Sequence, residues 1–363
     1  MVLPISRFWY KFSLFLACLL VFWAGFYPEW VEKYYAQAFY PHWSRTLRFL
    51  LGNIPFSLGD LVYGLALLLL FWAIGRMGRD WGRMGFRSAS WLWLGKILHA
   101  LLWVYLLFSL CWGLLYVRPS LGTRWQLKPV AYQKEDIRRL TLSLLDSTRK
   151  YRQRLGTEAV WRPCRDSLVP WTLSAYAPLA LAQRTPALDQ ASLKPSLFGA
   201  VGDWVGYTGY FNPFTGEGQY RADLPFVLQP FVALHETAHQ LGYAPEDEAS
   251  WVAYTAALNH PSDRVRYSAH LELLGYALAE EFLLYGQEGS FAAFDSIAKE
   301  NKARMDPGVR ADRKRIRDFF LSRQNQVSPA MNALYDQYLK LNRQEKGLRS
   351  YHAVLSWALA HQN

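Results

Sequence analysis

Long runs of apolar residues dominate the first third of the chain. Three of them, 12–28, 56–75 and 97–117, are almost without charge. A helix needs about 20 mostly apolar residues to cross the hydrocarbon layer of a membrane. The third run is long enough, the first is close to that length, and the second reaches it when the residues before Asp60 are included. The pattern predicts three transmembrane helices in a membrane domain, residues 1–118.

The first run also has features of a cleaved signal peptide, because Arg7 and Lys11 precede it and the small residue Ala24 lies near its end. A cleavage site needs a second small residue two positions earlier, where this chain has the bulky Phe22. Two further apolar runs follow. The sequence therefore favours a retained membrane anchor.

Lysine and arginine in short loops indicate the orientation, since cytoplasmic loops carry the excess. Residues 1–11 and 76–96 together contain seven of these residues, whereas 29–57 contains three. The N-terminus and the second loop are therefore expected in the cytoplasm. After three crossings, residues 119–363 are expected on the extracytoplasmic side.

The remaining two thirds of the chain has a different pattern. Apolar residues recur at helical spacing in 135–155, 266–286 and 329–344, with charged residues between them. The segment 199–225 is rich in glycine, aromatic and turn residues, which is typical of one or two short strands. We expect one mainly α domain with a small β element over 119–363.

Composition supports a membrane protein. Hydrophobic residues make up 52% of the 363 residues and charged residues 19%, which is more apolar than usual for a soluble domain. The formal net charge of +11 raises the alternative of nucleic-acid binding. The sequence contains no zinc finger, RNA-binding aromatic signature or dense Lys/Arg run, so we expect a lipid bilayer and no nucleic acid as partner.

The stretch HETAHQLGYAPEDEASW, 235–251, contains the candidate chemistry. Pro230 can begin a helix, on which His235 and His239 lie one turn apart on the same face. Both imidazoles can then bind one cation, and Glu236 beside them is placed to act on a water at that cation. This HExxH pattern predicts Zn²⁺, with Glu236 as the catalytic residue.

The third zinc ligand is open between carboxylates of a second predicted helix, 245–259. A histidine ligand is excluded where Pro245 stands, which leaves Glu246, Asp247 and Glu248. Acidic residues also favour a first helical turn without any metal. We prefer Glu248, which shares a face with Trp251 toward the first helix, and keep Glu246 as the alternative.

Metallopeptidases commonly hold substrate as an added strand on a sheet edge. The segment 206–219 precedes the HExxH helix, where such an edge is expected. Its substrate-binding candidates are Tyr210, Asn212, Thr215 and Gly216. An ordinary hairpin packed on the helix explains the same pattern.

The chain resembles a family of bacterial membrane proteins known as domain of unknown function 3810. The resemblance rests on KPSLF (194–198), GYFNPFTGEGQ (209–219), HETAHQLGYAPEDEASW (235–251), YDQYLK (335–340) and the three apolar runs. The family resembles gluzincin-type zinc peptidases, whose third ligand is a glutamate. This implies a zincin-like domain in a bacterial inner membrane, with ligands His235, His239 and Glu248 and with Glu236 as general base. Asn is expected after the EDEA run, where this chain has Ser250.

We therefore expect a membrane-anchored zinc metallopeptidase that cleaves a peptide or protein substrate through a zinc-bound water activated by Glu236. Tyr338, Tyr351 and His352 are candidate oxyanion stabilisers. A non-catalytic zinc-binding envelope scaffold or sensor is the alternative. Intramembrane proteolysis is disfavoured, because only a short apolar run precedes His235 and acidic residues follow it. The sequence does not indicate a substrate side chain or an oligomeric state.

Overall fold

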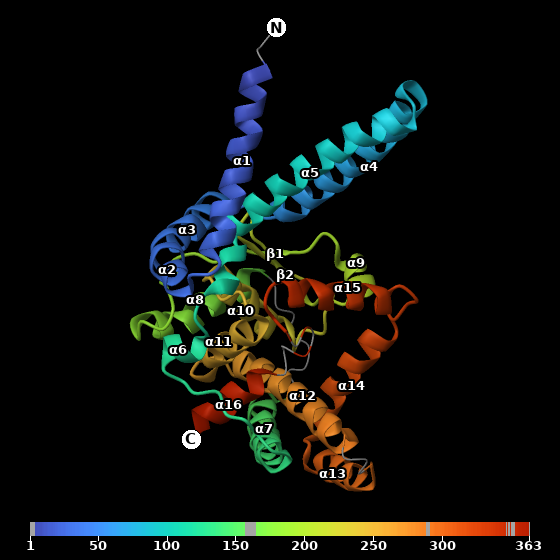
Figure 1. The fold of residues 1–363 in the computed structure, drawn as a ribbon. Helices are drawn as coiled ribbons and strands as arrows, with labels where there is room; N and C mark the ends of the chain where they lie inside the picture. The colour runs from blue at the N-terminus through green and yellow to red at the C-terminus, as the bar shows by residue number, and fades with distance from the viewer. Residues whose placement is uncertain are drawn as a thin grey trace.

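The computed structural model describes residues 4–156, 165–287, 291–345, 347, 349 and 353–362. The helices are α1 Pro4–Ala24, α2 Pro28–Trp30, a π-helical segment Val31–Phe39, α3 Tyr40–Leu51, α4 Leu58–Met84, α5 Phe86–Cys111, a 3-10 turn Gly113–Val117, α6 Leu121–Trp125, α7 Lys134–Arg154, α8 Arg165–Leu181, α9 Gly199–Val205, α10 Gln229–Gln240, α11 Glu246–Leu258, α12 Asp263–Gln287, α13 Phe291–Arg304, α14 Pro307–Leu321, α15 Ser328–Leu341 and α16 Val354–Gln362. The strands are β1 Leu193–Pro195, β2 Gly209–Asn212 and β3 Glu217–Tyr220. The predicted mainly α fold with a small β element is confirmed (Figure 1).

Within the described residues, two helices, α4 and α5, are long and apolar enough to cross a membrane. A third crossing is present if α1 and the helical segment Pro28–Leu51, which are bent by 102° relative to each other, are taken as one span. Helices α4 and α5 form a hairpin that turns at Gly85, whose φ of +79° suits glycine. Figure 1 shows this hairpin and the N-terminal part of α1 projecting away from the other helices.

The boundaries of the predicted spans need correction. The run 97–117 was expected to cross throughout, but α5 ends at Cys111 and the 3-10 turn after it is buried. That turn packs with Val31, Tyr35 and Tyr40 in one apolar cluster. Hydrophobicity along the chain does not distinguish side chains that face lipid from those that face protein. The segment 29–57, expected as a simple connecting loop, is largely helical and contributes to the same cluster.

The larger helical part of the molecule comprises α6 to α16. Helix α10 lies at its centre, and all residues of α10 are buried. It packs in one core with α7, α8, α11, α12 and α16. The predicted helices at 135–155, 266–286 and 329–344 are confirmed as α7, α12 and α15. The amphipathic pattern succeeds for α7 and α12 because each has one face on this core, whereas α15 lies outside the core and buries Leu339.

A small sheet covers another side of α10. Its strand order is β1-β3-β2, with β1 parallel and β2 antiparallel to β3. A Cβ on Gly218 would lie 2.8 Å from Cβ of Glu236, so glycine allows the strand to approach the helix closely. The predicted short strands in 199–225 are confirmed for β2 and β3, but residues 199–205 form helix α9.

The first turn of α4 is attached to this sheet. The buried carboxylate of Glu217 accepts hydrogen bonds from the backbone N–H groups of Leu58, at 3.2 Å, and Gly59, at 2.6 Å. A carboxylate at a helix N-terminus satisfies free N–H groups and complements the helix dipole. Asp60 in the same turn accepts from the N–H of Leu197, at 2.6 Å, and from the Tyr210 hydroxyl. A helix of the apolar hairpin thus begins directly on the sheet.

Candidate metal centre

Two histidines on α10 form the first part of the site. His235 and His239 are one turn apart, and their Nε2 atoms are 3.1 Å from each other. The Nδ1 of His239 donates to the carbonyl of Tyr243 at 2.7 Å, so Nε2 is the nitrogen available as a ligand in the neutral imidazole. Such a backbone contact on the far nitrogen is usual for a histidine that binds a metal.

Glu246, the first residue of α11, completes the cluster. Its Oε2 lies 3.0 Å from Nε2 of His235 and 3.4 Å from Nε2 of His239. A tetrahedral zinc ion with bonds of about 2.0–2.1 Å separates its ligand atoms by about 3.3–3.4 Å. The donor set and the spacing of the His235–His239–Glu246 cluster therefore fit a zinc ion.

The preference for Glu248 as third ligand is corrected by this geometry. Its Oε1 accepts from the N–H of Leu121 at 2.7 Å, and its Oε2 pairs with Arg124. Residues two apart on a helix point about 200° apart, so Glu246 and Glu248 cannot both face α10. Glu248 instead connects α11 to α6, and the alternative Glu246 is the carboxylate that lies beside the two histidines.

Outer contacts fix the orientation of the cluster. The hydroxyl of Ser250 lies 3.1 Å from Nδ1 of His235, so Ser250 makes the contact for which Asn was expected. The Tyr335 hydroxyl donates to Oε1 of Glu246 at 3.3 Å. Tyr335 was not predictable as a site residue, because 89 residues separate it from Glu246 and no local pattern connects them.

Glu236 lies beside the cluster and is almost fully buried. Among the described residues its Oε2 has no hydrogen-bond partner, which is costly for a buried polar atom and typical of a group reserved for a ligand. Burial raises the pKa of Glu236 to about 8. Burial also acts to raise the pKa of Glu246, but the two imidazoles outweigh it and hold that pKa well below its usual range. The pKa of Glu236 is thus raised and that of Glu246 is lowered, although the two carboxyl groups are neighbours.

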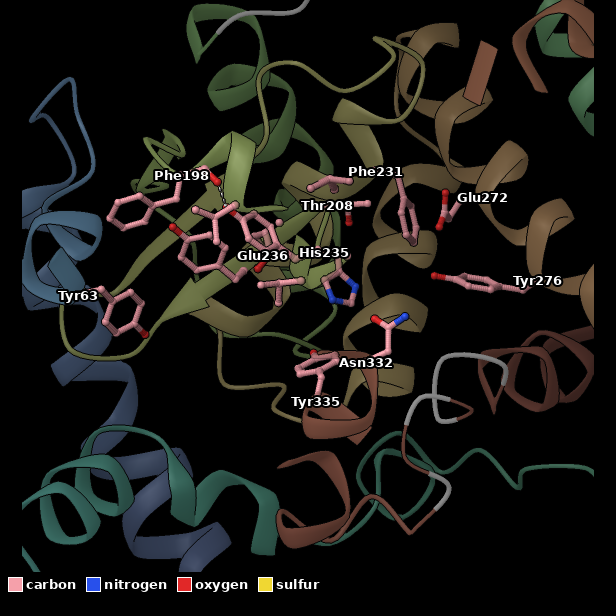
Figure 2. A pocket seen from close by; sticks show the side chains of 17 residues that line it. Tyr63, Phe198, Thr208, Phe231, His235, Glu236, Glu272, Tyr276, Asn332 and Tyr335 are labelled. Atoms are coloured by element: carbon pink, nitrogen blue, oxygen red, sulfur yellow. Dashed lines mark hydrogen bonds between the residues drawn. The ribbon is translucent and has the colours of Figure 1, made fainter. Parts of the chain in front are cut away.

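A cavity of about 490 Å³ opens over His235 and Glu236. Its other polar groups include Glu272 and Tyr276 of α12 and Asn332 of α15. Figure 2 shows these side chains around one space, with Tyr63 and Phe198 at one end and Glu272 and Tyr276 at the other. The lining residues comprise Tyr63, Phe198, Val201, Val205, Gly206, Tyr207, Thr208, Gly209, Tyr210, Phe231, Val232, His235, Glu236, Glu272, Tyr276, Asn332 and Tyr335.

Of the four predicted substrate-binding residues, only Tyr210 lines this cavity. The Oδ1 of Asn212 accepts from the N–H of Thr215 at 3.2 Å, and the Thr215 hydroxyl donates to Glu217. Gly216 has a φ of +64° and lies against Leu47 of α3. Asn212, Thr215 and Gly216 therefore build the buried β2–β3 turn, and their assignment to substrate binding is corrected.

The late-chain candidates for an oxyanion stabiliser do not line the cavity where they are described. Tyr338 of α15 stacks on Tyr335, with ring centroids 6.0 Å apart, and is 39% exposed. Tyr351 and His352 lie outside the described residues. Tyr276 and Tyr335 are the tyrosines that α12 and α15 bring to the cavity.

Comparison with known proteins identifies the family of the chain. No curated protein and no solved structure matches it. The model of one family, described as a protein of unknown function (DUF3810), matches residues 35–359, which include α3 to α15 and the His235–His239–Glu246 cluster. The chain therefore belongs to the DUF3810 family.

Proposed function

We propose that this protein is a membrane-anchored zinc metallopeptidase. The observation that carries the proposal is the combination of a three-donor cluster, His235, His239 and Glu246, with an unpartnered Glu236 oxygen beside the same cavity. A zincin-like arrangement of the domain, of the gluzincin type, belongs to the same proposal. A glutamate as third donor supports that type.

The chain's own groups have distinct tasks in the proposed reaction. A zinc ion held by the cluster would lower the pKa of a water molecule and polarise the peptide carbonyl. Glu236 accepts a proton from the attacking water and delivers it to the leaving nitrogen. The water oxygen joins the carbonyl carbon, the C–N bond breaks, and a carboxylate and an amine are formed.

The apolar helices support a location in a membrane, which we assign to the bacterial inner membrane. The N-terminal part of α1 and the turn of the α4–α5 hairpin both point away from the larger helical part (Figure 1). Both ends carry the basic residues that favour the cytoplasm. The His235–His239–Glu246 cluster is accordingly proposed to act on the extracytoplasmic side.

A non-catalytic zinc site in a scaffold or sensor is the second candidate. Structural zinc sites usually close with a fourth protein ligand. Among the described residues, three metal-binding donors gather here and a cavity lies beside them. This geometry favours catalysis over a purely structural role.

The adjacent carboxylates of α11 allow a matched test. We would purify the full-length protein, Glu246→Ala and Glu248→Ala in detergent and measure zinc per chain by mass spectrometry. We expect about one zinc per chain in the parent and Glu248→Ala, and a loss of at least tenfold in Glu246→Ala. Glu236→Gln is expected to keep zinc and lose peptide cleavage. Retention of zinc by Glu246→Ala would contradict the ligand assignment, and full cleavage by Glu236→Gln would contradict the mechanism.

A further inference from the structure

The cavity beside the metal cluster shares a wall with the membrane hairpin. Tyr63 of α4 lines the cavity together with Phe198 and Tyr210, and the rings of Tyr63 and Tyr210 are 6.5 Å apart. The apolar run of α4 begins within one turn of Tyr63. The cavity therefore lies at the level where α4 enters the apolar layer of a membrane.

The α4 wall of the cavity is held in place by direct contacts with the sheet and not by a connecting loop. Glu217 and Asp60 hold the first turn of α4 on the sheet, as described above. A Cβ on Gly59 would lie 2.6 Å from Nε2 of Gln219, so the α4 backbone is packed directly on β3. At the end of α5, the ring of Trp112 lies 5.7 Å from that of His239. Both helices of the hairpin thus meet the domain next to the site.

The open end of the cavity lies on the hairpin side. His235 and Glu236 form its buried floor, whereas Tyr63 and Val201 line it and are also exposed, at 37% and 46%. The two other helices that contribute to the cavity wall, α9 and α15, carry further exposed apolar side chains outside the cavity lining, and we call these side chains the apolar rim. They are Trp204 on α9 and Leu334 and Leu341 on α15, at 57%, 64% and 84%.

Figure 1 shows α9 and α15 on the side of the domain over which the α4–α5 hairpin projects. An exposed apolar rim with a tryptophan is costly in water and suits the boundary between lipid and water. The described residues that line the cavity include no lysine or arginine.

We propose, on the basis of the peptidase function above, that the substrate is a membrane-anchored polypeptide that enters this cavity from the lipid boundary between α4, α9 and α15. The bond cleaved lies in the apolar segment immediately outside the substrate's own membrane anchor. Hydrolysis consumes one water, breaks the peptide C–N bond and leaves the anchor with one new terminus. Free peptides in solution are poor substrates by comparison.

Linker length gives a test that does not depend on catalysis. Full-length Glu236→Gln protein, with benzoylphenylalanine in place of Val201, is placed in nanodiscs of phosphatidylethanolamine and phosphatidylglycerol. The probes are random octapeptides joined to a single membrane-spanning helix, either directly or through a 40-residue Gly/Ser linker that reaches about 35 Å. The same octapeptides without an anchor form the third probe. Light-induced cross-links are counted for each.

We expect the directly joined probe to cross-link at least tenfold more than the free octapeptides and at least as much as the long-linker probe. A control protein with benzoylphenylalanine in place of Arg139 on α7, at the end of the domain far from the hairpin, should favour the long linker (Figure 1). Cross-linking at position 201 that requires the long linker, or no cross-linking there from any probe, overturns the proposal.

A second pair of variants tests the rim itself. Trp204→Ser is expected to lower cross-linking of the directly joined probe several-fold, whereas Leu181→Ser, at an exposed leucine outside the cavity lining, should leave it unchanged. An equal change in cross-linking for Trp204→Ser and Leu181→Ser would contradict the role of the rim.

Experiments on the parent protein separate this inference from the peptidase proposal. Cleavage without any preference for anchored probes retains the peptidase and rejects the membrane route, whereas cross-linking without cleavage retains the route and rejects the peptidase.

Discussion

Gly209 makes room for Glu236. A Cβ at this position would lie 2.6 Å from Oε1 of Glu236 and 2.8 Å from Cγ1 of Val232. Gly209→Ala therefore displaces the Glu236 carboxylate, at a cost of about 1–3 kcal/mol for overpacking. We expect normal zinc content and at least a tenfold loss of peptide cleavage. Gly286→Ala, where a Cβ meets nothing within 4 Å, is the matched control. Equal activity in the two variants would contradict the placement of Glu236.

Ser250 orients His235 through the contact at Nδ1. Its removal leaves the ligand set intact but frees the ring to rotate, and such outer contacts are worth about 10–100-fold in metal affinity. We expect Ser250→Ala to bind zinc more weakly by about that factor in competition with a chelator. Thr255→Ala, at a hydroxyl that bonds the helix backbone on the same α11, should bind zinc as the parent does. An unchanged affinity in Ser250→Ala would reject this role.

At the scale of elements, α12 is held against α7 and α11 through a buried histidine. The ring centroid of His270 lies 5.0 Å from that of Tyr151 and 5.3 Å from that of Tyr254. Burial, together with the cations Arg266 and Lys150, lowers the pKa of His270 from 6.5 to about 4. His270 is therefore neutral in the folded protein over a range in which it is charged in the unfolded chain.

This shift predicts a loss of stability in acid. Between about pH 6.5 and pH 4 the unfolded chain binds a proton at His270 that the folded protein does not, so the free energy of unfolding falls as the pH falls. The contribution is about 3 kcal/mol at 1.36 kcal/mol per pKa unit. We expect the thermal midpoint in detergent and chelator to fall less for His270→Phe than for the parent between pH 7 and pH 4.5. Identical falls would show that His270 does not titrate in this way.

At the scale of the whole molecule, the domain and the hairpin turn are expected on opposite sides of the membrane. Arg87 lies beside the hairpin turn and Arg139 on α7. In a background without Cys18, Cys111 and Cys164, we expect Arg139→Cys, but not Arg87→Cys, to react with a membrane-impermeant thiol reagent in intact cells. Both should react after the cells are opened. The reverse pattern would place the cluster in the cytoplasm.

The HExxH helix illustrates how far local sequence reaches. His235, Glu236 and His239 are placed relative to one another by helical periodicity alone, so their grouping was predictable from five consecutive positions. Helices α7, α12 and α15 were predictable for the same reason, since one apolar face repeats at helical spacing. Helix α9 was not, because three glycines and two valines within or next to it resemble a turn-rich strand region.

The sequence by itself determined the membrane-type composition, the mainly α class and the paired histidines, because these depend on side chains close together in the chain. Tertiary structure alone decided that Glu246 faces the histidines while Glu248 faces Arg124, since this depends on how α11 is rotated against α10 and α6. Tertiary structure also decided that Asn212 and Thr215 belong to the β2–β3 turn. It decided likewise that Tyr335 contacts Glu246 and that Tyr63 lines the cavity. Such contacts join segments far apart in sequence, and the packing free energy that selects them belongs to the whole core rather than to any one segment.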